Sequence, residues 1–313
     1  MNNYKFERLS NKNLKDLVFL YQESFNEKTN LEFLQKKYDT HSFGLSFVGY
    51  VAYDSVSNEP AAYYGVFPIK VRYFNELILA AQSGDTMTHP NHRGKGLFIT
   101  LAKMTYELAK NNSVEFIFGF PNENSYGGFI KKLNWTVYAN INNYKIKSSA
   151  LPFEKVAKKF PFFNYFYSKI FLKKIYSKSL FQPFSNSIDS QISNVGFVEH
   201  DAHFYNYKTY YRSTIISVEG INCWIKIDGR LWIGDIEYCN KEKFYSVVIG
   251  LLSLAKKICC STIQFSVQEN SDYDKWLKEK YDINSQNPVG CLNLGTRLNP
   301  ENFAYQALDF DTF

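Results

Sequence analysis

A short turn with two glycines and two basic residues is the part of this sequence best suited to hold an anion. The turn spans Asn91–Gly96, includes Arg93, Gly94 and Lys95, and leads directly into a stretch with helical spacing of apolar residues. Glycine lets the backbone turn sharply and come close to a ligand. The N–H groups at the start of a helix point outward at the positive end of the helix dipole. We therefore predict an anion cradle at this turn, of a kind that suits a pyrophosphate.

Strands and helices on both sides must position this turn. Leu77–Thr88 reads as the strand before it, Val114–Phe120 as the strand after the helix, and Pro121-Asn122 opens a further helix. The elements expected upstream are a strand, two helices and two strands, at Tyr4–Leu9, Ser10–Phe25, Asn30–Asp39, Leu45–Tyr53 and Ala61–Tyr73. From the residues alone, this order predicts an α/β fold with an α+β type of mixed sheet.

Arg93–Phe98 resembles the acyl-CoA pyrophosphate loop of the GNAT superfamily of N-acetyltransferases. His89-Pro90 before the loop and Asn122 after it follow the family's order, and the resemblance covers roughly residues 4 to 147. It implies the GNAT-like acyl-CoA N-acyltransferase fold, in which neighbouring strands splay apart and the thioester arm lies in the gap. Phe98 departs from the pattern, which has a small residue there. If Phe98 faces the core, the amides stay free; if it faces the cofactor, it opposes phosphate binding.

The resemblance also implies which residues hold acetyl-CoA. Strand backbone near Met87 and Thr88 would hold the thioester carbonyl and the pantetheine arm, and amides of the loop would hold the pyrophosphate. The predicted cofactor-binding residues are Met87, Thr88, Arg93, Gly94, Lys95, Gly96, Leu97, Phe98, Asn122, Ser125 and Phe129. The last three lie on adjacent turns of one helix face and could line the pantetheine channel.

Acyl transfer to an amine needs a neutral amine, an aligned thioester and a proton for the departing thiolate. Asp85 is the candidate base, because it lies on the strand just upstream of the predicted arm-binding residues. The alternative is that Asp85 bonds only to nearby protein groups. The family often has a tyrosine where this chain has Phe129, which cannot donate a proton, so Tyr126 and Tyr138 are the substitutes for the acid.

Two adjacent glycines, Gly127 and Gly128, stand inside the helix that Asn122 opens. A glycine within a helix costs about 1 kcal/mol relative to alanine. We therefore expect a close approach at this point, either by the cofactor or by a packed strand.

The last third of the chain repeats the order of predicted elements found in the first. Its elements are a hairpin that turns at Gly229, a helix, a strand, a helix and a strand, at Cys223–Asp228, Leu231–Glu237, Lys241–Lys257, Thr262–Val267, Asp272–Lys280 and Val289–Leu294. A second, degenerate GNAT-like half is the interpretation. Its helix opens at Asn240 without a glycine loop, so it should hold no pyrophosphate. The predicted domains are residues 1–148 (acyl-CoA-binding), 149–194 (aromatic, basic helical linker) and 195–313 (GNAT-like).

The segment Pro152–Pro183 combines many Phe, Tyr and Lys residues with almost no acids. One interpretation is a basic amphipathic segment that makes a peripheral contact with an anionic membrane. The other is a helical linker that packs its aromatic rings between two domains and leaves its lysines in solvent. Pro161 interrupts the helix and apolar residues fall on more than one face, which favours the linker.

Composition limits the remaining function classes. The 313 residues are 45% hydrophobic and 21% charged, as expected of about two globular domains. The net charge of +6 is modest and gives no argument for nucleic acid. The five cysteines form no CxxC pair, His89 and His92 lack a third ligand nearby, and His200 and His203 are isolated, so we expect no metal. With no apolar stretch of ~18 residues and no signal-peptide pattern, we expect no transmembrane segment and a cytoplasmic setting.

The resemblance implies an N-acetyltransferase that uses acetyl-CoA and a primary amine on a small molecule. Amino sugars, sugar nucleotides and aminoglycosides are the acceptor classes that analogy favours. The alternative is a catalytically silent GNAT-fold protein that binds acyl-CoA or a partner, because Phe98 and Phe129 depart from the family at functional positions. A transferase that used aminoacyl-tRNA would need no pyrophosphate cradle, so the loop argues against it.

Overall fold

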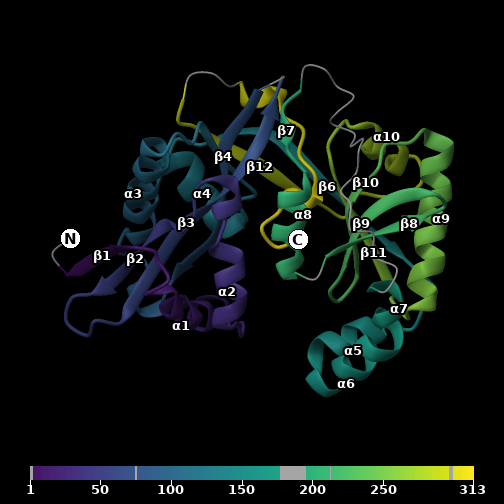
Figure 1. Ribbon diagram of the computed structural model, residues 1–313, viewed down its shortest axis with the longest axis horizontal. Helices are drawn as coiled ribbons and strands as arrows, with labels where there is room; N and C mark the ends of the chain where they lie inside the picture. Colours follow the sequence, from purple (N-terminus) through teal and green to yellow (C-terminus); the bar gives the residue numbers. More distant parts are fainter. Residues whose placement is uncertain (1–2, 75, 177–194, 212, 296–298) are drawn as a thin grey trace. The chain divides into compact units, whose positions relative to one another are not determined.

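The computed structural model describes residues 3–74, 76–176, 195–211, 213–295 and 299–313 (Figure 1). The chain divides into two compact units, the first formed by Met1–Tyr138 with Pro288–Asn302 and the second by Ala139–Asn287 with Phe303–Phe313. This division differs from the predicted domains, which end at residues 148 and 194. The described part of the predicted linker belongs to the second unit, and residues 288–302 belong to the first. Residues 177–194 of the predicted linker lie outside the described residues.

The first unit contains the elements that the sequence predicts around the glycine turn. Its helices are α1 (Leu14–Phe25), α2 (Leu31–Tyr38), α3 (Leu97–Asn111) and α4 (Glu123–Lys132), with short 3-10 turns at His41–Phe43 and Pro90–His92. Its strands are β1 (Tyr4–Arg8), β2 (Val48–Asp54), β3 (Pro60–Tyr73), β4 (Glu76–Thr88), β5 (Phe116–Gly119) and β12 (Ser285–Asn293), in the sheet order β1-β2-β3-β4-β5-β12. Neighbouring strands are antiparallel except β4 and β5, which are parallel.

Each face of the first unit's sheet carries its own hydrophobic core. Successive side chains of a strand point to opposite faces, and β3 shows this directly. Tyr63 packs with buried residues of α1 and α2, such as Leu17 and Leu34, whereas Tyr64 packs with Leu101 of α3. The helices α3 and α4 therefore cover one face, and α1 and α2 cover the other.

The strands β4 and β5 pair over a very short length. The register joins only Ala81 to Ile117 and Gln82 to Phe118, although β4 continues beside β3 as far as Thr88. Asp85 interrupts β4 with a positive φ of 50°, at a register shift opposite Tyr63–Gly65. Such a bulge bends a strand locally. The backbone of β4 beyond Gln82 is thus free of pairing with β5, as the splayed arrangement of the GNAT fold implies.

The second unit has its own mixed sheet, with the strand order β6-β11-β10-β9-β8. Its strands are β6 (Thr136–Lys147), β8 (Thr214–Val218), β9 (Ile221–Ile227), β10 (Leu231–Ile236) and β11 (Thr262–Gln268), and the unit also contains the short strand β7 (Phe197–Val198), which lies outside this order. Its helices are α5 (Phe153–Lys159), α6 (Pro161–Tyr167), a π-helical turn (Ser168–Leu172), α7 (Lys173–Tyr176), α8 (Ala202–Lys208), α9 (Lys241–Lys257) and α10 (Asp272–Lys278). The predicted hairpin is present as β9 and β10, with Gly229 at a φ of +64° in the turn.

The last strand of each repeated set of elements pairs in the other unit's sheet. β6 follows α4 along the chain, yet Ile141–Lys147 pairs with β11 of the second unit. β12 follows α10, yet Gly290–Asn293 pairs with β5 of the first unit. This exchange explains why neither unit is a continuous stretch of sequence. The predicted boundaries had assumed continuous domains.

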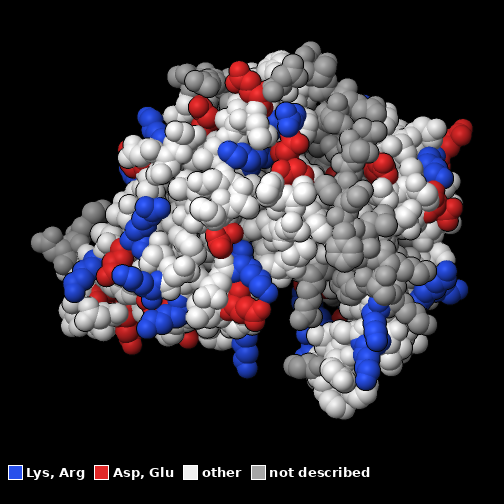
Figure 2. Space-filling model, viewed as in Figure 1, with Lys and Arg blue, Asp and Glu red and all other residues white. Residues whose placement is uncertain are grey.

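Charges of both signs are mixed on the molecular face that Figure 2 shows. Lysine and arginine side chains alternate there with aspartate and glutamate among the described residues. No broad stripe of one sign is visible on this face, in keeping with the modest net charge of +6.

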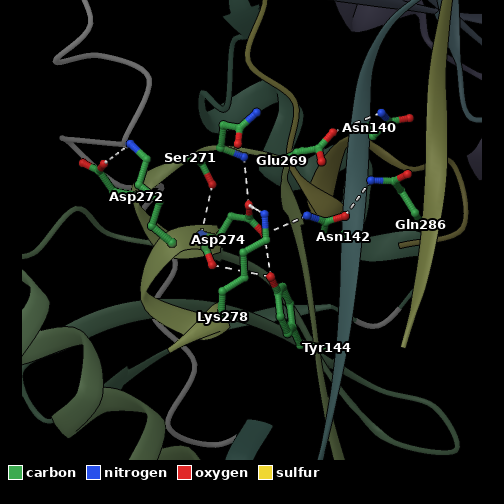
Figure 3. A network of polar contacts seen from close by, with 11 residues as sticks. Asn140, Asn142, Tyr144, Glu269, Ser271, Asp272, Asp274, Lys278 and Gln286 are labelled. Carbon is green, nitrogen blue, oxygen red and sulfur yellow. Dashed lines mark hydrogen bonds and ion pairs between the residues drawn. The ribbon is translucent and has the colours of Figure 1, made fainter. Parts of the chain in front are cut away.

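A buried carboxylate holds β6 against α10 in the second unit (Figure 3). Asp274 is fully buried and accepts hydrogen bonds from Asn142 Nδ2 at 2.8 Å and Tyr144 Oη at 2.5 Å, both on β6. It also accepts from the Asn270 N–H and lies 2.8 Å from Lys278 Nζ. Burial opposes the charge, but these bonds outweigh it and lower the pKa of Asp274. A strand contributed by the first repeat is thereby fastened to the second unit by specific polar contacts.

Candidate functional site

The glycine turn leads into α3 with its backbone exposed. Gly94 and Gly96 have φ values of +75° and +78°, and a Cβ atom added at either would meet nothing within 4 Å. Gly96 is the N-cap of α3 and has no side chain to bond the first N–H groups, whereas Asn122 caps α4 and Asn240 caps α9. An N-terminus without a side-chain cap leaves donors for another acceptor. The geometry therefore fits the predicted anion cradle, and the capped α9 does not.

Basic groups surround this cradle. Arg93 Nε donates to the Thr88 carbonyl at 3.3 Å, which holds the arginine beside the end of β4. Lys95 Nζ lies 6.0 Å from the centre of the Tyr4 ring. His92 Nδ1 and the Tyr4 hydroxyl share a hydrogen bond of 2.8 Å, and burial, followed by the nearby Lys95 charge, lowers the pKa of His92. Arg93 and Lys95 therefore supply the positive charge at neutral pH.

Phe98 faces the core of the first unit. Its ring centre lies 5.1 Å from that of Phe129 and 5.8 Å from that of Tyr64. This orientation leaves the amides of the loop free, the first of the two alternatives. It also corrects the explanation of the adjacent glycines: a Cβ atom on Gly128 would lie 2.5 Å from Phe98 Cε1, whereas one on Gly127 would meet nothing within 4 Å. The group that approaches Gly128 is a side chain of α3, neither cofactor nor strand.

Several predicted cofactor residues have other structural roles. Phe129 is 4% exposed and packs on Trp135 with ring centres 4.5 Å apart, so its ring is part of the core. Met87 and Leu97 are buried as well, which leaves only their backbone groups for a ligand. Asn122 and Ser125 form a capping box, in which each side chain accepts a hydrogen bond from the other's N–H. Contacts between the cofactor and these side chains stay predictions.

The candidate base, Asp85, forms a buried ion pair. Lys37 Nζ lies 2.8 Å from Oδ1 and 2.7 Å from Oδ2, and the Tyr38 hydroxyl donates to Oδ2 at 2.8 Å. The lysine side chain is fully buried and that of Asp85 is 7% exposed. Burial, followed by the Asp85 charge, raises the pKa of Tyr38. Asp85 therefore does bond to nearby protein groups, as the alternative interpretation expected. The role of Asp85 as a base stays a prediction.

The two tyrosines considered as acids lie in different surroundings. Tyr126 is 39% exposed on α4, and Tyr138 is half-buried near the start of β6. Their roles as proton donors stay predictions.

A chain of buried hydroxyl groups ends at the junction of β4 and β5. Trp135 Nε1 donates to Tyr106 Oη at 2.9 Å, Tyr106 Oη lies 3.1 Å from Tyr64 Oη, and Tyr64 Oη lies 2.8 Å from Ser83 Oγ. Burial raises the pKa of Tyr64 and Tyr106, so both phenols stay protonated. Because an indole N–H can only donate, the bonds can run from Trp135 toward Ser83, which leaves the serine proton for a further acceptor.

Ser83 stands where the two strands separate. It follows Gln82, the last residue of β4 in register with β5, and its Cβ lies 3.3 Å from the position that a Cβ atom on Gly119 would take. Sequence reasoning missed this chain, because its four members come from β4, β3, α3 and the segment before β6 and form no local pattern. No local signal in the sequence marked these four residues as hydrogen-bond partners, since bonded members lie 19 to 42 positions apart.

His200 is not isolated, contrary to expectation. In the second unit its Nε2 lies 2.8 Å from Asp309 Oδ1, and its Nδ1 lies 3.5 Å from Asp235 Oδ2. Burial alone would lower the pKa of His200, but the bonds to Asp235 and Asp309 outweigh burial and raise it to about 10. The two carboxylates come from β10 and from the segment after residue 303, so the sequence showed no cluster.

Comparison with known families agrees with this geometry. Residues 5–138 match the family model described as "Acetyltransferase (GNAT) domain". These residues form a GNAT domain. The loop, the split between β4 and β5 and the uncapped α3 all lie within the matched GNAT domain. A comparison with curated proteins finds no match.

Solved structures extend the likeness beyond the GNAT domain. A GCN5-related N-acetyltransferase from Kribbella flavida is 10% identical, with a TM-score of 0.57 over 92% of this chain and 70% of that one. Another from Anabaena variabilis is 12% identical, with a TM-score of 0.57 over 93% and 73%. A conserved Enterococcus faecalis protein described as a probable N-acyltransferase is 12% identical, with a TM-score of 0.59 over 93% and 73%. At such identities the likeness shows the fold, and it includes both units.

Proposed function

We propose that this protein transfers an acetyl group from acetyl-CoA to a primary amine of a small molecule. The observation that carries the proposal is the open glycine turn in front of the uncapped α3, with Arg93 and Lys95 beside it. A GNAT domain supports an acyltransferase in general. The pyrophosphate of acetyl-CoA is the anion that this cradle would bind, through backbone N–H groups of Gly94–Phe98.

The pantetheine arm would lie where β4 leaves β5. Beyond Gln82, the backbone groups of β4 on that side have no partner on β5 in the register, so they can bond an extended ligand. The arm would then bring the thioester close to the bulge at Asp85, between Ser83 and Met87. In this position the thioester carbonyl would bond to the backbone near Met87 and Thr88.

The reaction forms a C–N bond and breaks the C–S bond, and the proton that the amine loses balances the proton that the thiolate gains. Asp85, or a water held by its carboxylate, would accept the amine proton. Because Phe129 offers no hydroxyl, we assign to Ser83 the hydrogen bond that stabilises negative charge on the departing sulfur. The hydroxyl chain behind Ser83 would leave the serine proton for this hydrogen bond, and Phe129 itself packs on Tyr64 of that chain, at 6.2 Å between ring centres.

The acceptor proposed is an amine on an amino sugar, a sugar nucleotide or an aminoglycoside. Analogy with GNAT enzymes is its support. A cytoplasmic setting completes the proposal, and the five free cysteines are compatible with a reducing compartment. Among the described helices, none is long and apolar enough to cross a bilayer.

A silent acyl-CoA-binding protein is the rival, since Phe129 replaces the proton donor common in GNAT enzymes. Calorimetry with acetyl-CoA, followed by a thiol-release assay against a panel of amines, separates the two. Saturable binding with amine-dependent release of CoA is the expected result. Binding without release for every amine would favour the silent protein, and absence of binding would reject both.

A further inference from the structure

Large apolar side chains are exposed in unusual density on α5, α6 and the turn that follows. Of the seventeen exposed large hydrophobic residues described in the chain, seven lie between residues 151 and 170. They are Leu151, Val156, Phe160, Phe162, Tyr165, Phe166 and Ile170. Phe162 is 79% exposed and Tyr165 is 63% exposed. Exposed apolar groups gathered in this way mark an interaction surface more often than scattered ones do.

The inner side of the same segment is well packed. Ala157, Tyr167 and Leu172 form a buried cluster with Phe153, Phe163 and Phe171, which also contacts Ile227 of β9. Lys158 Nζ lies 3.1 Å from Asp228 Oδ1 at the β9–β10 turn. The segment is therefore anchored to the second unit by one set of aromatic rings while a second set points outward. The linker interpretation, in which the rings pack between domains, leaves this second set unexplained.

The outer aromatic rings form a patch of their own. Phe166 contacts Phe162 with ring centres 4.9 Å apart and Tyr165 with ring centres 5.7 Å apart. Lys169 Nζ lies 5.7 Å from the centre of the Tyr165 ring. We call Phe160, Phe162, Tyr165, Phe166 and Ile170 the outer patch.

The exposed charged residues that the segment Phe153–Tyr176 itself contributes are lysines, one of which, Lys158, is paired with the partly exposed Asp228 of the β9–β10 turn. Lys155, Lys158, Lys159, Lys169 and Lys173 are exposed, and Figure 2 shows lysine side chains beside uncharged surface over α5 and α6. The single acid of Phe153–Tyr176 is Glu154, which is 2% exposed and accepts a hydrogen bond from Ser261 Oγ at 2.6 Å. The segment thus presents aromatic rings and ammonium groups outward and keeps its carboxylate inside.

We infer that the outer patch and its lysines dock this protein on the surface of an anionic phospholipid bilayer. Aromatic rings enter the boundary between headgroups and acyl chains, while lysines bond the phosphates. The helices are too short to cross a bilayer, and the extended backbone of Phe160 separates them, so both can lie in the plane of the surface. Membrane docking does not depend on acetyl transfer, because its residues lie outside the GNAT domain.

Flotation with lipid vesicles tests this docking in the full-length protein. We expect binding to vesicles of phosphatidylcholine mixed with phosphatidylglycerol, weak binding to phosphatidylcholine alone, and release at high salt. Replacing Phe162→Ser should weaken binding about tenfold, from the loss of one buried ring. Lys159→Glu and Lys169→Glu should each weaken binding to the anionic vesicles and leave the low affinity for neutral ones unchanged.

Matched controls come from exposed residues elsewhere. Val56→Ser and Ile249→Ser remove exposed apolar side chains far from the outer patch in sequence, and Lys12→Glu reverses an exposed charge. These variants should bind as the wild type does, and all variants should keep the thermal midpoint.

Equal binding to both vesicle types, no binding at all, or equal effects of patch and control variants would overturn the proposal. Stronger retention on immobilised polyglutamate than on anionic vesicles would point to an acidic protein partner. Self-association in lipid-free buffer that Phe162→Ser abolishes would assign the patch to a second copy of the chain.

Discussion

Lys37 of α2 and Asp85 of β4 form an ion pair of 2.7 Å that is almost wholly removed from solvent. The pair joins a helix of the first unit to the bulge at which the proposed thioester site lies. A buried charge without its partner is strongly destabilising, whereas loss of both partners together costs much less. A single replacement of Asp85 therefore changes both the stability of the fold and any catalytic role, and cannot separate the two.

We expect Asp85→Asn alone to lower the free energy of unfolding by ~3–5 kcal/mol, because Lys37 stays buried and charged. The double variant Lys37→Met with Asp85→Asn should lose much less in denaturant unfolding. The double variant is also the proper test of the base. If Asp85 accepts the amine proton, kcat of the double variant falls by about 10²–10⁴-fold and its pH–rate profile changes. A folded double variant with the wild-type profile excludes Asp85 as the base.

Gly96→Ala should weaken acetyl-CoA binding about tenfold, because it distorts the donors at the start of α3. Gly220 offers a matched control in the second unit, with a φ of +77° beside +78° for Gly96 and the same open surroundings. Both alanine variants should lose ~1–2 kcal/mol of stability from the left-handed backbone. Calorimetry should then show weaker binding for Gly96→Ala alone; equal affinities would remove the loop from the binding site.

Gly128→Ala should be less stable than Gly127→Ala by ~1–3 kcal/mol, since only the former places a methyl group against the Phe98 ring. Gly127→Ala itself should gain ~0.5–1 kcal/mol from helix propensity. Thermal unfolding of both variants measures the difference. Adding Phe98→Leu should recover stability in the Gly128→Ala background, and a failure to recover would place the overlap elsewhere.

Ser83→Ala should raise the pKa of the thiol of bound CoA by about 1–2 units, because it removes a hydrogen bond to the thiolate. Ultraviolet absorbance of the thiolate during a pH titration measures this change without an amine acceptor. Tyr64→Phe should cause a smaller rise, whereas Tyr53→Phe, which loses a hydroxyl bond of 2.7 Å to Asp16, should cause none. If Ser83→Ala binds CoA tightly and the pKa of the bound thiol equals that in the wild type, Ser83 does not stabilise the thiolate. That result would contradict the role of Ser83 without contradicting CoA binding.

His200 should make the stability of the protein depend on pH above neutrality. Its pKa rises from ~6.5 in the unfolded chain to about 10 when folded, so its contribution is complete below pH ~6.5. As the pH rises toward 10, the folded state loses this contribution and the free energy of unfolding falls. His200→Gln should be less stable at neutral pH and should show a flatter decline between pH 7 and 10. Parallel curves for the two proteins in denaturant titrations would contradict this linkage.

Many helices and strands in both units follow from local signals. The predicted helix Lys241–Lys257 has the bounds of α9, and the Gly229 hairpin is present where its turn residue indicates. Two glycines before a stretch with helical spacing of apolar residues predicted the loop and the start of α3, and both glycines have a positive φ in the structure. These features depend on residues within a few positions of one another, so backbone preference and hydrophobic spacing are enough to predict them.

The hydrogen-bond and ion-pair partners of buried polar groups could not be predicted from the sequence. Asp85 was chosen from its place on a strand, but nothing near it in sequence pointed to Lys37, 48 positions away. The same holds for the hydroxyl chain from Trp135 to Ser83 and for the carboxylates around His200, because their members also lie far apart in the sequence. Pairings of this kind depend on which faces meet after folding, and a single sequence carries no record of them.

The sequence by itself determined the order of elements around α3 and the glycine turn in front of it, because each follows from spacing and backbone chemistry along a short stretch. Tertiary structure alone decided that β6 and β12 exchange sheets, that Phe98 turns inward against Gly128, and that half of the aromatic rings of α5 and α6 face outward. A strand can pair along either edge and a ring can turn to either face at little local cost. Only packing against distant residues chooses between them.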